Sequence, residues 1–246
     1  MKIFLLPLLQ IWHALSKPVI DVIIPAFNEE ESIGKVIADI PPGWAREVLV
    51  CNNGSTDRTA EVAEQAGATV LTELRKGYGS ACLKGMAHIA SRPDSEKPDI
   101  VVFLDADYSD HPDEMPKVVA PLLEAGYDLV IGSRALGQLE AGAMMPQQIF
   151  GNWLATTLIR LIYNYHFTDL GPFRAVRYDK LLELNMQDPN FGWTVEMQVK
   201  AAKQKMKATE VPVSYRRRIG VSKVSGTVKG SILAGYKILW TIFKLV

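Results

Sequence analysis

The sequence predicts one α/β domain built on a mainly parallel β-sheet with helices on both faces. Apolar runs of strand length alternate with segments of helical period along most of the chain, which is typical of strand–helix–strand units. A length of 246 residues fits one large α/β domain, or such a domain with a short appendage. Hydrophobic residues make up 48% of the chain, enough for a sizeable core.

Six short apolar segments are the predicted strands, because each is bounded by polar or turn-forming residues. The segment that ends before Asp105 is the most apolar of them. In chain order the predicted strands are Val19–Pro25, Glu47–Cys51, Ala68–Leu71, Ile100–Leu104, Tyr127–Ile131 and Val211–Tyr215.

Helices are predicted between and after these strands from their helical period. A segment rich in Gly, Ala and Met, Ala135–Pro146, is predicted to be a loop. The predicted helices are Glu29–Ile40, Asp57–Ala66, Gly79–Ala90, Gln148–Tyr163 and Thr194–Lys205.

Polar or glycine-bearing segments follow four of the predicted strands. Ligands of such sheets bind at the carboxyl ends of the strands, so these segments are the candidate site. They are Pro25-Ala26-Phe27-Asn28-Glu29, Asn52-Asn53-Gly54-Ser55, Asp105-Ala106-Asp107 and Gly132-Ser133-Arg134.

Asp105 and Asp107 are spaced to share a hard divalent cation at a strand end. Mg²⁺ and Mn²⁺ prefer oxygen ligands and commonly bridge carboxylates to phosphate oxygens. Such a metal neutralises charge on a departing nucleoside diphosphate. The alternative is a solvated pair of aspartates that opens a turn.

The first strand lacks the Gly-x-Gly-x-x-Gly fingerprint that would favour a dinucleotide. Asn53 and Asp57 bracket a Gly-Ser-Thr turn, for which two interpretations stay open: a capped helix start, or an Asn53 amide that binds the edge of a nucleobase. Lys76 and Gly77 place a cation and a flexible backbone near a helix start, suited to phosphate or a base edge.

The ordered series of these motifs resembles the family 2 glycosyltransferases of Rossmann-like GT-A fold. The downstream half resembles one branch of them, the dolichol-phosphate mannose synthases and polyprenyl-phosphate glycosyltransferases. That narrower resemblance is carried by Thr168–Arg174, Val195-Glu196-Met197, and Val211–Arg218 with Ser222-Lys223. It covers about residues 19–223.

The resemblance implies a role for each matching position. The nucleotide sugar, a UDP- or GDP-hexose, would contact Pro25, Ala26, Asn28, Glu29, Asn53, Asp57, Lys76, Gly77, Asp105, Ala106 and Asp107. Asp105 and Asp107 would bind Mg²⁺ or Mn²⁺. The acceptor phosphate and the donor diphosphate would meet Arg134, Arg174, Arg218 and Lys223, and arginine geometry suits phosphate.

Three positions depart from the family pattern. Asn52-Asn53 stands where the family usually has two aspartates, Pro172 where the branch often has serine, and Ser109 where a longer side chain can assist the metal. Three choices are left open: the nucleobase of the donor, glucose or mannose as its sugar, and Mg²⁺ or Mn²⁺ as the metal.

Whether the reaction needs a general base depends on the chemical class of the acceptor. A polyprenyl or dolichyl phosphate is already anionic, whereas a hydroxyl of a glycan or glycolipid needs deprotonation. Asp107 and Glu196 are the catalytic candidates, with Glu196 as the base by position or, alternatively, a structural helix acid. A non-catalytic nucleotide-sugar-binding protein at a membrane is a further alternative.

Both ends of the chain are apolar. We expect an apolar segment over residues 1–17, the glycosyltransferase domain over 18–221, and an amphipathic helix over 222–246. That helix would lie on a membrane surface, or else pack on the domain or on another subunit. The expected location is therefore cytoplasmic and peripheral to the membrane, with the oligomeric state open. Equal numbers of basic and acidic residues, 27 each, give no indication of nucleic-acid binding.

Overall fold

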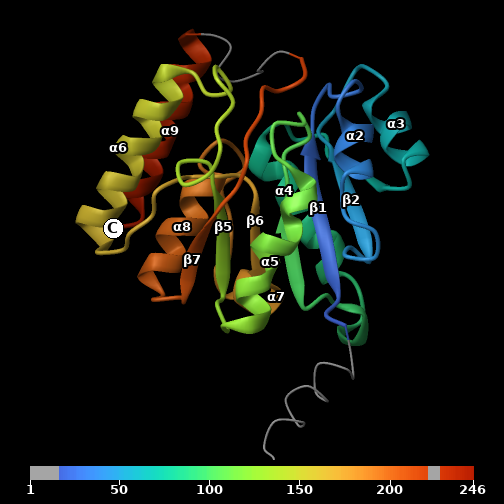
Figure 1. Cartoon of the computed structure of the whole chain (residues 1–246), viewed down its shortest axis with the longest axis horizontal. Helices are drawn as coiled ribbons and strands as arrows, with labels where there is room; N and C mark the ends of the chain where they lie inside the picture. The colour runs from blue at the N-terminus through green and yellow to red at the C-terminus, as the bar shows by residue number, and fades with distance from the viewer. Residues whose placement is uncertain (1–16, 221–227) are drawn as a thin grey trace, which may run out of the picture.

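The computed structural model describes residues 17–220 and 228–246, and its centre is a seven-stranded sheet (Figure 1). The strands are ordered β3-β2-β1-β4-β6-β5-β7 across the sheet. In chain order they are β1 (Ile20–Ala26), β2 (Glu47–Asn52), β3 (Thr69–Thr72), β4 (Ile100–Phe103), β5 (Leu129–Ser133), β6 (Arg174–Arg177) and β7 (Ala208–Pro212).

The mainly parallel sheet is confirmed. β1 pairs in parallel with β2 and β4, β2 with β3, and β5 with β7. The exception is β6, which runs antiparallel between β4 and β5 and was not predicted. The last strand begins three residues earlier than predicted, and Tyr215 instead forms isolated bridges with Asp110 and Leu139.

Helices cover both faces of the sheet, as predicted. They are α2 (Ile33–Ala38), α3 (Thr59–Gln65), α4 (Tyr78–Ala90), α5 (Met115–Glu124), α6 (Pro146–Tyr163), α7 (Tyr178–Glu183), α8 (Trp193–Lys203) and α9 (Val228–Lys244), with single 3₁₀ turns at Asp94–Glu96 and Pro112–Glu114.

The core consists of two apolar layers, one on each face of the sheet. Because side chains alternate along a strand, Ile23 of β1 joins the layer beneath α4, α6, α7, α8 and α9, whereas Val22 and Ile24 join the layer beneath α2, α3 and α5. β1 and β4 are buried along their whole length, as expected for central strands covered on both faces.

Helix α9 packs against α6 and α8 at the end of the sheet that carries β5 and β7 (Figure 1). Thr241 and Ile242 are buried in this contact. Leu233, Tyr236, Trp240 and Phe243 are exposed along the same helix. The predicted amphipathic character is therefore present, with one face on the domain and the other open.

Within the part of the chain that the structure describes, no helix combines the length and the apolarity needed to cross a membrane. The predicted apolar segment 1–17, apart from Lys17, and the candidate residue Lys223 lie outside the described residues.

Candidate functional site

The carboxyl ends of β1, β2, β4 and β5 line a cavity of about 580 Å³. The predicted strand-end segments therefore meet, as the rule for parallel sheets requires. Of the residues predicted to bind the donor or the acceptor, those on the wall are Pro25, Ala26, Glu29, Asn53, Lys76, Gly77, Asp105, Ala106, Asp107, Arg134 and Arg218.

Asp105 is held through one carboxylate oxygen and Asp107 through both. The Tyr78 hydroxyl donates to Oδ1 of Asp105 at 3.0 Å. The backbone N–H of Ser109 donates to Oδ1 of Asp107 at 2.9 Å, and the Ser109 hydroxyl donates to the same oxygen. Oδ2 of Asp107 forms an ion pair with Arg218, whereas Oδ2 of Asp105 accepts no hydrogen bond from any described residue.

The electrostatics of this loop favour an added cation. Burial, reinforced by the negative charge of Asp107, raises the pKa of Asp105 to about 6. Burial and the two neighbouring aspartates also raise the pKa of Asp110 well above its ordinary value. Oδ1 of Asp110 is buried with no hydrogen-bond partner among the described residues. The carboxyl groups of Asp105, Asp107 and Asp110 thus lie close together, and the positive charge around them does not balance three carboxylates.

This donor set fits Mg²⁺ or Mn²⁺, because both metals prefer oxygen ligands. Among the described residues no three acidic, histidine or cysteine side chains are placed to hold a metal ion together. The protein would therefore offer Asp105 and Asp107, and phosphate oxygens would have to supply further ligands, as they commonly do for Mg²⁺.

Hydrogen bonds connect the turn after β1 to the turn after β2. Oδ1 of Asn28 accepts from the backbone N–H of Thr56, and Asp57 accepts from the N–H of Glu30 and from Thr59. Asn28 and Asp57 do not line the cavity. Both residues hold the two turns in shape through these hydrogen bonds. Direct contact of either residue with the nucleotide stays a prediction.

Asn53 lines the cavity, but its amide is engaged by the protein. It donates to the carbonyls of Glu73 and Arg75 and accepts from the N–H of Gly77. The amide thereby fixes the 73–77 loop, and binding of a base edge by this amide would require it to exchange those bonds.

Lys76 and Gly77 stand at the start of α4. The Lys76 ammonium is 5.4 Å from the centre of the Phe27 ring, close enough for a cation–π contact. Gly77 has a φ of 135°, and a Cβ there would collide with the carbonyl oxygen of Pro189. Glycine is required here by both conformation and close approach.

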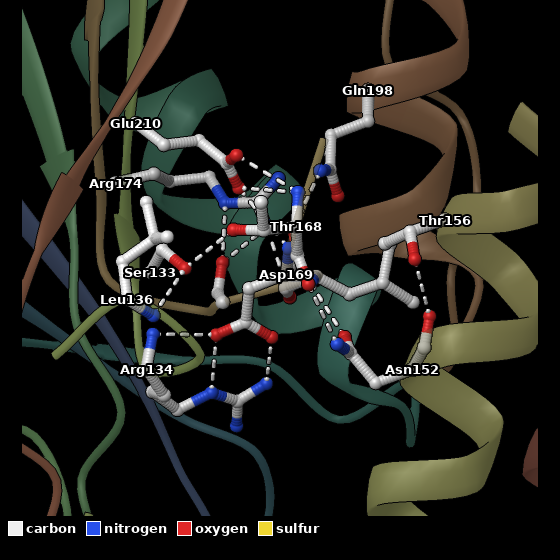
Figure 2. A network of polar contacts seen from close by, with 12 residues as sticks. Ser133, Arg134, Leu136, Asn152, Thr156, Thr168, Asp169, Arg174, Gln198 and Glu210 are labelled. Carbon is white, nitrogen blue, oxygen red and sulfur yellow. Dashed lines mark hydrogen bonds and ion pairs between the residues drawn. The ribbon is translucent and has the colours of Figure 1, made fainter. Parts of the chain in front are cut away.

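Arg134 belongs to a closed polar network around Asp169 (Figure 2). Its guanidinium donates twice to Asp169, through Nε at 2.8 Å and Nη2 at 2.7 Å, and stacks 5.0 Å from the Tyr215 ring centre. Glu210 accepts from the N–H groups of Thr168 and Asp169, and Asn152 bridges Thr168 to Leu170. Burial alone would raise the pKa of Asp169, but Arg134 outweighs it and the pKa lies below its ordinary value.

Arg174 was predicted to contact phosphate, and that contact stays a prediction. It is fully buried, it does not line the cavity, and its guanidinium donates to the carbonyls of Leu170, Gly171 and Thr194. Burial lowers its pKa to about 10. Arg174 therefore joins β6 to α8.

Glu196, the candidate base, also lies off the cavity wall. Its carboxylate accepts from the backbone N–H groups of Gln187 and Asp188 and pairs with Lys200 at 2.7 Å. It is buried away from the cavity. These contacts are those expected of a structural helix acid, and a role as general base stays a prediction.

Sequence reasoning gave no role to several residues of the cavity wall. Tyr78 follows the Lys76-Gly77 pair, and Tyr215 lies beneath Arg134. Helices α6 and α9 also line the cavity, through Gln147, Gln148, Gly151, Asn152, Gly235 and Ile238. In the sequence these two helices are recognised by their helical period. That period predicts a helix but does not predict which cavity or surface the helix faces.

A segment from late in the chain, residues 215–219, covers the loop that carries Asp107. The N–H of Arg216 donates to the carbonyl of Ser109, and the N–H of Ile219 donates to the carbonyl of Asp107. The Arg216 guanidinium stacks 3.3 Å from the Tyr108 ring centre. This segment brings Arg218 to Asp107.

Comparison with known proteins identifies the class to which this fold and site belong. Residues 21–184 match the model of glycosyl transferase family 2. The chain belongs to that family, and it is a transferase of glycosyl groups.

Two relatives are similar to this chain over most of its length. The chain is 39% identical over 217 residues to an uncharacterised glycosyltransferase of Mycobacterium tuberculosis, covering 87% of this chain and 94% of the relative. It is 31% identical to a dolichyl-phosphate hexose transferase of Haloferax volcanii, covering 86% of this chain and 89% of that one.

The solved structure shares the fold. It is glucosyl-3-phosphoglycerate synthase of Mycobacterium tuberculosis, in complex with Mn²⁺, uridine diphosphate and phosphoglyceric acid. The TM-score is 0.74 at 23% identity, over 100% of this chain and 84% of that chain.

Proposed function

We propose that the protein is a metal-dependent inverting glycosyltransferase that moves a hexose from a UDP- or GDP-sugar to a polyprenyl or dolichyl phosphate. The relative named for dolichyl-phosphate hexose transfer supports this acceptor class. One observation carries the proposal: the cavity runs from Asp105 and Asp107 to the inner faces of α6 and α9, whose outer faces are apolar and exposed.

The donor would occupy the strand-end half of the cavity. Pro25, Asn53 and Lys76 line the side that a nucleoside would fill, and Asp105 with Asp107 would hold the cation bound to its diphosphate. When bound, that cation would neutralise the charge that develops on the departing nucleoside diphosphate. Arg218 lies against Asp107, so it is placed to add a second positive charge there.

The acceptor would enter between the strand ends and the two helices. A phosphate anion attacks the anomeric carbon without losing a proton, so no general base is needed. That agrees with Glu196 being engaged by backbone N–H groups. Arg134 lines the cavity, and its Nη1 makes no hydrogen bond to a described residue, so it can still donate to a phosphate.

An acceptor of this class is held in a membrane, and α6 and α9 offer an apolar face for one. Phe150 and Trp153 of α6 and Tyr236 and Trp240 of α9 are all more than half exposed. Figure 1 shows the two helices side by side at one end of the molecule. Exposed aromatic side chains on amphipathic helices are typical of proteins that bind a membrane interface. We propose peripheral attachment at the cytoplasmic face through this surface.

The direct test is transfer from a panel of labelled UDP- and GDP-hexoses to undecaprenyl or dolichyl phosphate, with Mg²⁺ or Mn²⁺. We expect a lipid product whose sugar is released by mild acid, as a phosphodiester-linked sugar is. The control is Asp107→Ala, which should form no product.

Other outcomes would separate the alternatives. Transfer to a glycolipid hydroxyl, with an acid-stable product, would replace the lipid phosphate by a hydroxyl acceptor. Binding of a nucleotide sugar without turnover on any acceptor would favour a non-catalytic protein.

A further inference from the structure

The hydroxyl of Tyr78 makes one hydrogen bond among the described residues, and it goes to Asp105. Tyr78 is the first residue of α4, and its ring packs against the core layer on that face. The hydroxyl reaches the end of β4 and donates to Oδ1 of Asp105 at 3.0 Å. Tyr78 and Asp105, 27 positions apart in the chain, thereby join the start of α4 to the loop after β4.

The backbone around Tyr78 leaves little freedom for this hydroxyl. A Cβ on Gly79 would collide with the carbonyl oxygen of Asp188, as one on Gly77 would with Pro189. The N–H of Ser80 donates to the carbonyl of Pro189 at 2.9 Å. Two glycines thus allow the start of α4 to approach residues 188–190 closely, and two hydrogen bonds from Ser80, through its N–H and its hydroxyl, hold it to the Pro189 carbonyl.

The neighbouring aspartate is held in a similar way. Ser109 donates its hydroxyl to Oδ1 of Asp107, just as Tyr78 donates to Oδ1 of Asp105. Each carboxylate has one oxygen fixed by a hydroxyl, and its second oxygen is turned elsewhere. For Asp105 that second oxygen, Oδ2, accepts no hydrogen bond from a described residue.

We propose that Tyr78 is a positioning residue: it orients the carboxylate of Asp105 so that Oδ2 is presented to a divalent cation bound with the nucleoside diphosphate. The inference rests on the metal-dependent transfer proposed above. A partner that orients a metal-binding carboxylate typically contributes a factor of about 10–100 in metal affinity or activity.

The test is the affinity of the full chain for Mn²⁺, measured by electron paramagnetic resonance in the presence of UDP or GDP. Tyr78→Phe keeps the ring and removes only the hydroxyl. We expect roughly tenfold weaker Mn²⁺ binding, a lower kcat that more Mn²⁺ partly restores, and an unchanged KM for the acceptor. A merely structural hydroxyl would lower the melting temperature and leave the Mn²⁺ affinity unchanged.

Tyr165→Phe is the matched control. Its hydroxyl donates to the carbonyl of Met206 at 2.9 Å, and Tyr165 does not line the cavity. That variant should lose stability but bind Mn²⁺ as the unsubstituted chain does. If Tyr78→Phe is unstable at the assay temperature, its Mn²⁺ affinity is measured at a lower temperature at which circular dichroism shows it folded, beside Tyr165→Phe under the same conditions.

The possible failures can be told apart. Equal Mn²⁺ affinity in Tyr78→Phe and the unsubstituted protein would overturn the positioning role and leave the proposed function intact. Absence of Mn²⁺ binding to the unsubstituted protein with either nucleotide would overturn both.

Discussion

Two groups of buried carboxylates lie near the same cavity and differ in how their charge is balanced. Asp169 is held by two hydrogen bonds from the Arg134 guanidinium, by a third from the Arg134 N–H, and its pKa lies below its ordinary value. Asp105 has one hydroxyl partner and a pKa of about 6, and Asp110 nearby keeps an oxygen that no described residue contacts by a hydrogen bond.

The difference separates carboxylates that support the fold from those available to a ligand. A buried acid with its charge fully paired stabilises the folded chain, whereas an underpaired acid lowers stability until a cation arrives. Substitutions in the two groups should therefore have opposite signatures. The first group should affect stability most, and the second should affect activity most.

Asp107→Asn should have the largest effect, and on activity. Removing one of two carboxylates that would hold the cation should reduce kcat by about 10³-fold, equivalent to roughly 4 kcal/mol. Initial rates of hexose transfer at saturating Mn²⁺ would measure it. Asp113→Asn, at an exposed acid, is the control. A loss of less than tenfold for Asp107→Asn would contradict the assignment.

Asp169→Asn should have the next largest effect, and on stability. It leaves the buried Arg134 guanidinium without its anion, which typically costs about 3–5 kcal/mol of unfolding free energy. Urea denaturation would measure it. Asp179→Asn, which breaks the exposed pair with Arg177, should change stability by less than about 1 kcal/mol. Similar losses of unfolding free energy in Asp169→Asn and Asp179→Asn would contradict a stabilising role for the buried Asp169–Arg134 pair.

Asp105→Asn should raise stability when metal is absent. The pKa of Asp105 is about 6 in the folded chain and about 3.9 in an unfolded one, so the folded chain binds the extra proton between these values. The unfolding free energy of the unsubstituted protein in EDTA should thus fall as pH rises from about 4 to about 7.

The Asn variant lacks this ionisation. It should be more stable than the unsubstituted protein by about 3 kcal/mol at pH 7.5 and have a flatter profile between pH 4 and 7. Melting temperatures in EDTA across this range would measure it. Parallel pH profiles of the two proteins would show that Asp105 ionises normally.

Glu196→Gln should have the smallest effect on activity. Its carboxylate lies off the cavity, so kcat should stay within about twofold, while loss of the Lys200 pair and weaker acceptance from Asp188 should lower stability by about 1 kcal/mol. Rates on lipid phosphate would check this. A 100-fold loss of kcat without a stability change would restore Glu196 as a base.

Local sequence pattern predicted the apolar strands well because their burial comes from their own side chains. Five of the six predicted strands match observed ones closely. β6 was missed because Arg174-Ala175-Val176-Arg177 is short and carries two charges, and it becomes a strand only through pairing with β4 and β5. The pairing partner, not the segment, determines that structure.

The site was predictable in its location and less so in its members. Strand ends of a parallel sheet converge, so Asp105, Asp107 and Arg134 could be placed together. The partners of Arg174 and Glu196 are mostly backbone carbonyls and N–H groups, which a list of side chains does not show. Tyr78 was missed because its hydrogen-bond partner, Asp105, lies 27 positions away in the chain.

The 215–219 segment has a consequence for biosynthesis. Arg218 pairs with Asp107 across 111 positions of sequence. At about 5–20 residues per second, roughly 5–20 s of translation separate the two. During that interval the aspartate loop leaves the ribosome without the segment that later covers it. Chaperones or free divalent cations would meet these carboxylates before Arg218 does.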